Sequence, residues 1–242
     1  MSPAVRRGNG AKIGRRSPGA GDAPGAGRAA RVPVGGVRQN RGVTRVGDDA
    51  DPPESSVSLD YFTGLYLAKD DPWDLATKWH DQRKYAVTVA SLPRPRYRRA
   101  YEPGCSIGLL TRMLAPRCDE LLAVDCVDAA VAQTRDEVRE FPHVRAELAM
   151  LPADLPDATF DLIVVGDLLY YLSAGDLAAL LDGLVQRLEP GGDLVAVHFR
   201  DRENSGNYDG FNAHETLSRR PELRPAVHHD DEWFLLDVLR RL

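Results

Sequence analysis

The sequence contains no uninterrupted apolar run long enough to cross a membrane, since a membrane-spanning helix needs roughly 20 consecutive apolar residues. We also expect no export signal: two arginine pairs stand in the first 20 residues, but no apolar segment of the required length follows either pair. Its three cysteines show no Cys-x-x-Cys pairing. We therefore expect a cytoplasmic protein with reduced thiols and no membrane partner.

Large apolar side chains are nearly absent from the first 50 residues, which contain no Leu, Phe or Tyr. This stretch is rich in Gly, Ala, Arg and Pro, and it cannot bury enough surface to offset the entropy lost on ordering. It holds ten basic and three acidic residues, a charge of +7, which leaves −12 on the remainder of the chain. We predict that residues 1–57 form a disordered basic extension. A solvated tail is one interpretation, and a nucleic-acid-binding tail is the alternative.

From about residue 59 onward, apolar runs alternate with segments of helical spacing. The run at 160–165, Phe-Asp-Leu-Ile-Val-Val, is typical of a central parallel strand that is buried on both faces. This alternation predicts one doubly wound, Rossmann-like α/β domain over residues 58–242, with a seven-stranded sheet and any ligand at the carboxyl ends of the strands. The expected strands are 98–103, 121–125, 143–148, 160–165, 194–199 and a closing antiparallel pair, 226–229 and 233–239. The expected helices are 79–92, 107–114, 128–140, with Asp128 as its cap, 176–188 and 212–220.

The first expected strand runs into a glycine-rich turn, Glu102-Pro-Gly-Cys-Ser-Ile-Gly108. Gly104 permits a sharp turn without a Cβ clash, and Gly108 lets the following helix approach the strand closely. Backbone at such a helix N-terminus can contact the polar tail of a nucleoside. Because two glycines at a strand-helix junction also serve packing alone, the turn needs support from elsewhere in the chain.

Asp125 gives that support. It ends the second expected strand, 21 positions after Gly104, where an acid can accept hydrogen bonds from both hydroxyls of a ribose. This feature suits a dinucleotide and S-adenosylmethionine equally, and a helix cap is the alternative role. A dinucleotide fold expects Gly-x-Gly-x-x-Gly, whereas here an acid precedes two glycines spaced by three residues, so Glu102 would face a methionine amino group. Phe160-Asp161 and the Pro190-Gly-Gly192 turn complete the layout of a class I methyltransferase.

Residues from about 59 to 239 resemble the nodulation protein S-like branch of class I S-adenosylmethionine-dependent methyltransferases. The Gly-Cys-Ser turn and the Tyr-Tyr-Leu triplet after the fourth strand are the more specific parts. The founding members methylate an amino-sugar nitrogen on a chitooligosaccharide, so the resemblance implies N-methylation of a small polar acceptor. The matching stretches are Asp71-Pro72-Trp73, Gln82-Arg83-Lys84-Tyr85, Glu102 to Thr111, Phe160 to Leu172 and Val197-His198.

Two stretches depart from the usual pattern. Gly166-Asp167 stands where Ser-Glu is more usual, so the acid after the fourth strand is shortened but kept. After the third strand only Glu147 is acidic, and we expect Met150 and Leu151 to flank the adenine, with core packing as the alternative. The predicted cofactor-binding residues are Trp73, Arg83, Glu102, Gly104, Cys105, Ser106, Gly108, Asp125, Cys126, Met150, Leu151 and Asp167.

Methyl transfer needs no covalent nucleophile, because the cofactor supplies the reactivity while the protein positions and desolvates the reactants. An amine acceptor needs a free lone pair, so a group near the ends of the fourth and fifth strands must accept its proton. We predict Asp167 for this catalytic role, with Tyr170 and His198 next, since histidine titrates near neutral pH. A hydrogen-bonded structural role is the alternative for His198.

The sequence also admits functions outside amine methylation. The run at 228–232, His-His-Asp-Asp-Glu, contains metal-ligand types, but neighbouring residues on a strand point to opposite faces, so we expect no metal. The net charge of −5 gives no general attraction to nucleic acid, so we do not expect a nucleic-acid partner, although a tail-guided RNA methyltransferase is an alternative. The chain could instead methylate the oxygen of a sugar or natural-product hydroxyl, or be a non-catalytic fold that binds a partner.

Overall fold

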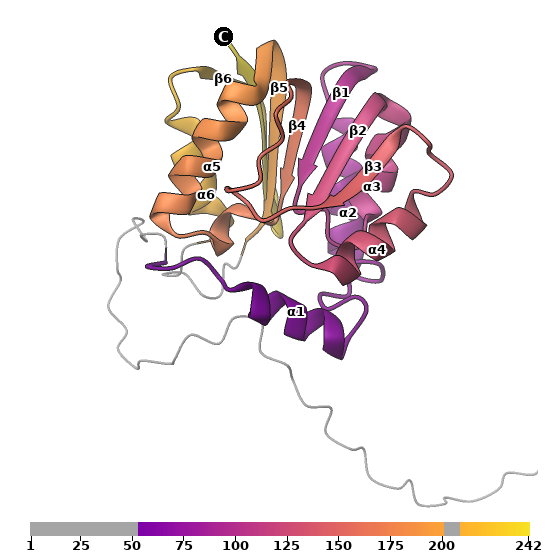
Figure 1. Ribbon diagram of the computed structural model, residues 1–242. Helices are drawn as coiled ribbons and strands as arrows, with labels where there is room; N and C mark the ends of the chain where they lie inside the picture. The colour runs from indigo at the N-terminus through magenta and orange to yellow at the C-terminus, as the bar shows by residue number, and fades with distance from the viewer. Residues whose placement is uncertain (1–52, 201–208) are drawn as a thin grey trace, which may run out of the picture. The chain divides into compact units, whose positions relative to one another are not determined.

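The computed structural model describes residues 53–200 and 209–242, where a seven-stranded sheet is flanked by helices (Figure 1). The strand order is β3-β2-β1-β4-β5-β7-β6, and β7 runs antiparallel to both of its neighbours. The order reverses between β1 and β4, which is the switch point of a doubly wound sheet. The predicted fold class is confirmed. The strands are β1 (Tyr97–Pro103), β2 (Cys118–Asp125), β3 (Val144–Leu148), β4 (Phe160–Gly166), β5 (Leu188–Phe199), β6 (Leu223–Asp230) and β7 (Phe234–Arg241).

Strand β4 occupies the centre of the sheet because its side chains suit burial on both faces. Leu162 and Val164 belong to the apolar cluster that includes residues of α2 and α3, whereas Ile163 and Val165 belong to the cluster that includes residues of α5 and α6. All four side chains are fully buried. Since side chains alternate along a strand, one uninterrupted apolar run supplies both halves of the core.

The helices begin and end where local sequence signals allow. The helix predicted from 107 starts two residues later, because Gly108 adopts a left-handed φ of 83°. The predicted cap of α4 is wrong: Val127 is the N-cap and Asp128 lies in the first turn, while Asp125 accepts a hydrogen bond from the Val127 N–H at 3.1 Å. The helices are α1 (Leu59–Ala68), α2 (Trp79–Ala90), α3 (Leu109–Leu114), α4 (Asp128–Glu137), α5 (Ala174–Arg187) and α6 (Gly210–Ser218), with 3-10 turns η1 (Ala115–Arg117) and η2 (Leu169–Tyr171).

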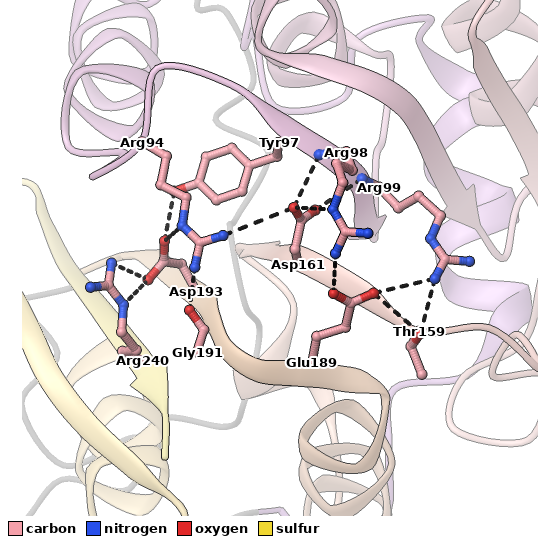
Figure 2. A network of polar contacts seen from close by, with 10 residues as sticks. All are labelled: Arg94, Tyr97, Arg98, Arg99, Thr159, Asp161, Glu189, Gly191, Asp193 and Arg240. Carbon is pink, nitrogen blue, oxygen red and sulfur yellow. Dashed lines mark hydrogen bonds and ion pairs between the residues drawn. The ribbon is translucent and has the colours of Figure 1, made fainter.

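Two buried carboxylates tie strands together near the amino ends of the parallel strands (Figure 2). Asp193 of β5 is 0% exposed and accepts hydrogen bonds from the Tyr97 hydroxyl and the Arg240 guanidinium, both at 2.8 Å. Asp161 of β4 accepts hydrogen bonds from two backbone N–H groups of β1 at 2.9 and 3.1 Å. Arg94 lies between the two acids, 3.5 Å from Asp193 and 4.0 Å from Asp161. A buried charge is tolerated only when it is paired, and the partners of these two acids lie on other strands. The network therefore connects β1, β4, β5 and β7 at the edge opposite the expected site.

Some predictions fall on residues that the structure does not describe. The extension predicted over 1–57 lies almost wholly outside the described residues, and so does most of the loop expected at 201–210. In the part of the chain that is described, no helix has the length and apolar character needed to span a bilayer.

Candidate cofactor site and active site

The turns that follow β1 and β4 touch each other at the carboxyl edge of the sheet. Gly104 has a φ of 79°, a left-handed conformation that favours glycine, and a Cβ added there would stand 3.5 Å from the Leu168 side chain. The N–H groups of Gly104 and Cys105 both donate to the Val124 carbonyl, at 2.8 and 2.9 Å. The Cys105 side chain is buried, so only its backbone belongs to the turn's surface. The predicted turn therefore lies at the switch point, where ligands of doubly wound sheets bind.

Asp125, at the end of β2, holds the other side of this turn. One carboxylate oxygen accepts a hydrogen bond from the Ser106 N–H at 2.9 Å, and the other accepts one from the Val127 N–H. Burial raises the pKa of Asp125, although these N–H groups oppose the rise. Each carboxylate oxygen can accept a second hydrogen bond, so the side chain keeps capacity for a ribose.

Glu102 is a buried acid with one carboxylate oxygen that lacks a hydrogen-bond partner in the described part of the chain, and this is the strongest indication of a ligand at this turn. It is 2% exposed near the end of β1, and its Oε2 has no hydrogen-bond partner among the described residues. Burial raises its pKa to about 8, and the charge of Asp125 adds to the rise. The Thr111 side chain opposes this rise. A buried carboxylate oxygen without a partner is nevertheless costly, and an ammonium group would relieve that cost. The residues present thus fit the amino group of a methionine moiety.

Two aromatic side chains from the amino-terminal part of the domain lie against the turn. The Tyr66 hydroxyl of α1 shares a 2.7 Å hydrogen bond with the Ser106 hydroxyl. The Tyr66 ring meets Trp73 edge-on, with ring centroids 5.7 Å apart, so Trp73 reaches the turn through Tyr66. Tyr66 was missed by the sequence prediction, where the only signal was the aromatic content of residues 59–74.

The segment after β3 lies beside Asp125, whose carbonyl accepts a hydrogen bond from the Ala149 N–H at 2.9 Å. Met150 is 41% exposed, whereas Leu151 packs against the apolar core of the sheet. Cys126 is half-buried on the other side of Asp125, against α1 and α4. Met150 is therefore free to flank a ligand, whereas the contacts of Leu151 favour the core-packing alternative.

The structure does not bring Arg83 to this turn. Its guanidinium pairs with Asp231 at 2.5 Å and lies over the Phe234 ring, 5.6 Å from the centroid. Consecutive residues on a helix point about 100° apart, so Arg83 and Lys84 leave α2 in different directions. Lys84 points to Asp167 instead. It was not predicted as a site residue, although it lies in the matching Gln-Arg-Lys-Tyr stretch.

Asp167 follows β4 with a φ of 47° and is held by three groups. It accepts hydrogen bonds from the Phe199 N–H at 2.7 Å and the Tyr170 hydroxyl at 3.0 Å, and it pairs with the Lys84 ammonium. Lys84 is 2% exposed and also pairs with Asp81 at 2.9 Å. Burial pushes the pKa of Asp167 up, but the Lys84 charge and the hydrogen bonds outweigh it and the net pKa is lowered. The arrangement keeps Asp167 anionic, so it can receive a cation or a hydrogen-bond donor.

His198 is fully buried near the end of β5, and both of its ring nitrogens are engaged. Nε2 accepts a hydrogen bond from the Leu169 N–H at 3.2 Å, and Nδ1 lies 2.9 Å from Nε2 of His214. The Tyr170 ring meets His198 edge-on at 5.5 Å. Burial lowers the pKa of His198 well below its ordinary value, and the neighbouring His214 adds to this. Since no ring nitrogen is left for a substrate proton, this geometry favours the structural alternative for His198.

The consecutive histidines of β6 point to opposite faces. His228 Nδ1 lies 2.7 Å from Asp237, whereas His229 lies 3.4 Å from Asp231 and stacks on Phe234. Across residues 53–200 and 209–242, no three metal-ligand side chains gather into a possible metal site.

Comparison with known proteins identifies sequence relatives. Residues 63–210 match the family described as Nodulation protein S (NodS). The chain is 35% identical to the Nodulation protein S of Rhizobium tropici over 139 residues, which cover 56% of this chain and 58% of that protein. It is 36% identical to that of Sinorhizobium fredii over 133 residues, which cover 53% and 61%. The chain thus spans less than two thirds of the length of these curated relatives.

Solved structures share the fold. The N-methyltransferase NodS from Bradyrhizobium japonicum WM9, in complex with S-adenosyl-L-homocysteine, is similar with a TM-score of 0.67 and 26% identity, over 75% of this chain and 97% of that one. The DhpI-SAH complex has a TM-score of 0.62 at 17% identity, over 76% and 94%, and shows the shared fold alone.

Proposed function

This chain belongs to the nodulation protein S (NodS) family, and from that premise we propose that it is an S-adenosylmethionine-dependent methyltransferase. The finer proposal is that it methylates an amine nitrogen on a small polar acceptor, such as an amino sugar. The observation that carries the proposal is the buried Glu102 carboxyl group beside the Gly104 turn, whose Oε2 has no hydrogen-bond partner among the described residues. An N-methyltransferase among the similar structures supports the choice of acceptor atom.

The cofactor would be held by residues at the ends of β1 and β2. Glu102 would pair with its amino group, and Asp125 would accept its ribose hydroxyls. Met150 would flank the base, while Tyr66 and Trp73 would cover the turn. S-adenosylmethionine supplies a methyl group that is activated by the positive sulfur, so the protein's task is to position and desolvate the acceptor.

The acceptor would lie near Asp167 and Tyr170. An ammonium group must give up a proton before its nitrogen can attack the methyl group, and Asp167, which would attract and orient the ammonium form, would accept that proton. Lys84 holds the Asp167 carboxylate in place, and because the same ammonium also pairs with Asp81, the three side chains together carry one net negative charge. This anionic group favours a cationic acceptor over a sugar hydroxyl.

Calorimetry with S-adenosylhomocysteine tests the cofactor site, because this product retains the amino group. The unmodified protein is expected to bind, and Glu102→Gln is expected to bind on the order of tenfold or more weakly, as a charged hydrogen bond is lost. Glu120→Gln, at an exposed position on β2, is the matched control and is expected to keep wild-type affinity. If the unmodified protein does not bind S-adenosylhomocysteine at high micromolar concentrations, the enzyme proposal fails, and the result favours a non-catalytic fold that binds a partner.

A paired acceptor assay tests the amine. A glucosamine oligosaccharide with a free amine and its fully N-acetylated counterpart are supplied with the methyl donor. We expect a methylated product from the free amine only, detected by mass spectrometry. Methylation of the acetylated sugar would instead favour the O-methyltransferase alternative.

A further inference from the structure

A line of polar side chains runs from the end of β5 to the protein surface. His198 of β5 contacts His214 of α6 at 2.9 Å, and Nδ1 of His214 lies 2.6 Å from Oδ2 of Asp237 on β7. The other Asp237 oxygen lies 2.7 Å from Nδ1 of His228 on β6. His198 and His214 are 0% and 3% exposed, whereas the His228 side chain is 61% exposed. The line therefore links the buried interior with solvent across four separate elements.

The inner end of the line reaches the candidate active site. His198 Nε2 accepts the hydrogen bond of the Leu169 N–H, and Leu169 is the first residue of η2. That turn carries Tyr170, whose hydroxyl donates to Asp167. The position of the Tyr170 hydroxyl thus depends on a turn that is anchored by the His198 ring.

One arrangement of protons satisfies every contact in the line. A backbone N–H can only donate, so Nε2 of His198 must be unprotonated and the ring must carry its proton on Nδ1. The Nδ1–H group of His198 donates to Nε2 of His214, which must therefore also be unprotonated. His214 then carries its proton on Nδ1 and donates a hydrogen bond to Asp237. Both histidines are therefore neutral and their tautomers are determined by their neighbours.

The packing of α6 supports this direct contact. Gly210 begins α6, and a Cβ added there would stand 2.8 Å from Cβ of His198 and 2.6 Å from the carbonyl oxygen of Phe199. The helix lies directly on β5 at this glycine, and one turn later it brings His214 to His198. Burial raises the pKa of Asp237, but its hydrogen bonds from His214 and His228 outweigh this and the net pKa is lowered, which keeps it an anionic acceptor.

We propose that His214 and Asp237 are positioning residues for the methyl-transfer site. They hold His198 as the Nδ1–H tautomer, so that its Nε2 retains the Leu169 N–H and η2 keeps the Tyr170 hydroxyl on Asp167. The expected effect on turnover rests on the proposed function, whereas the tautomers do not. Since the line joins β5, α6, β7 and β6, a change in it should affect turnover more than cofactor affinity.

The first test needs no substitution. In the ¹⁵N-labelled protein, long-range ¹H–¹⁵N correlation spectra distinguish the two neutral tautomers of each histidine. We expect His198 and His214 both to carry the proton on Nδ1. A proton on Nε2 of His198 would overturn the proposal whether or not any variant folds.

The second test is a matched pair of substitutions at His214. In His214→Gln the amide oxygen can accept from His198 and the amide NH₂ can donate to Asp237, whereas His214→Leu removes both contacts. For His214→Leu we expect a loss of kcat on the order of tenfold, with S-adenosylhomocysteine affinity within about twofold of wild type and a His198 tautomer that is no longer unique. His214→Gln should recover most of kcat and the Nδ1–H signal.

His229→Leu, on the opposite face of β6, is the control and should keep wild-type kcat. Equal kcat for His214→Leu and the wild type, or no recovery in His214→Gln relative to His214→Leu, would each overturn the proposal. Failure of the unmodified protein to bind S-adenosylhomocysteine would overturn the proposed function instead, and the tautomer measurement would still decide the role of the line.

Discussion

The Glu102 carboxyl group couples ligand binding to protonation at the scale of a single residue. In the free protein its pKa is raised to about 8, chiefly by burial. A carboxyl group whose folded pKa is raised contributes stability that is present below its unfolded pKa and is lost as the pH rises through the folded pKa. An ammonium ligand favours the ionised form, so binding should displace the proton.

This coupling predicts proton release when S-adenosylhomocysteine binds. Near pH 7 close to one proton should leave, and the number should fall as the pH rises through about 8. The measurement is calorimetry in buffers with different ionisation enthalpies, whose apparent binding enthalpies should differ in proportion. Glu102→Gln should show no such buffer dependence from this site. The same proton release in that variant would assign the proton to another group.

At the scale of elements, α4 and the Glu102–Gly108 turn are in close contact at one glycine. Gly108 has a φ of 83°, and a Cβ there would stand 2.8 Å from the Cα of Thr134 in α4. The Thr134 hydroxyl donates to the Ser106 carbonyl at 2.8 Å. The glycine at this position therefore serves the contact between the turn and α4, rather than only the approach of α3 to its strand.

Gly108→Ala should lower the free energy of unfolding by about 2 kcal/mol or more, because the left-handed conformation alone costs roughly 1–2 kcal/mol for a residue with a Cβ. Urea unfolding measures the loss, and calorimetry should show weaker S-adenosylhomocysteine binding because the turn shifts. Gly175→Ala in α5 is the matched control, since nothing lies within 4 Å of the added Cβ; it should be neutral or stabilise by about 0.5–1 kcal/mol. A Gly108→Ala variant as stable as the wild type would contradict the close approach.

At the scale of the whole described domain, the Asp193 network and the proposed ligand site lie at opposite edges of the sheet. The Asp193 network joins β1, β5 and β7 near the amino ends of the parallel strands, as Figure 2 shows. The Glu102–Gly108 turn and Asp167 lie at the carboxyl ends of β1 and β4. Changes at the two edges should therefore be separable in experiments.

Asp193→Asn should lower the free energy of unfolding by about 1–3 kcal/mol, because the Tyr97 hydroxyl and the Arg240 guanidinium would lose their charged hydrogen-bond acceptor. The affinity for S-adenosylhomocysteine of the folded fraction should stay near wild type. Asp119→Asn is the control: its pair with Arg96 is about half exposed, so a change of about 0–1 kcal/mol is expected. A large loss of affinity in Asp193→Asn would show that the two edges are coupled.

The sequence by itself determined the features that depend on neighbouring residues. The two-sided burial of β4, the left-handed turn at Gly104 and the acid at the end of β2 all follow from side-chain period, glycine spacing and strand ends. The closing antiparallel pair, expected at 226–229 and 233–239, is confirmed as β6 and β7. Local rules did fail at Asp128, because the side chain of Asp125 already served the start of α4.

The tertiary structure alone decided which distant side chains meet. Lys84 reaches Asp167 and Arg83 does not, because the rotation of α2 about its axis is set by packing and not by its sequence neighbours. His198 was predicted as a base from its type and position, but His214, on a different element, leaves it no nitrogen for that role. Such contacts join residues far apart in the chain, and their geometry exists only once the sheet and its helices have packed.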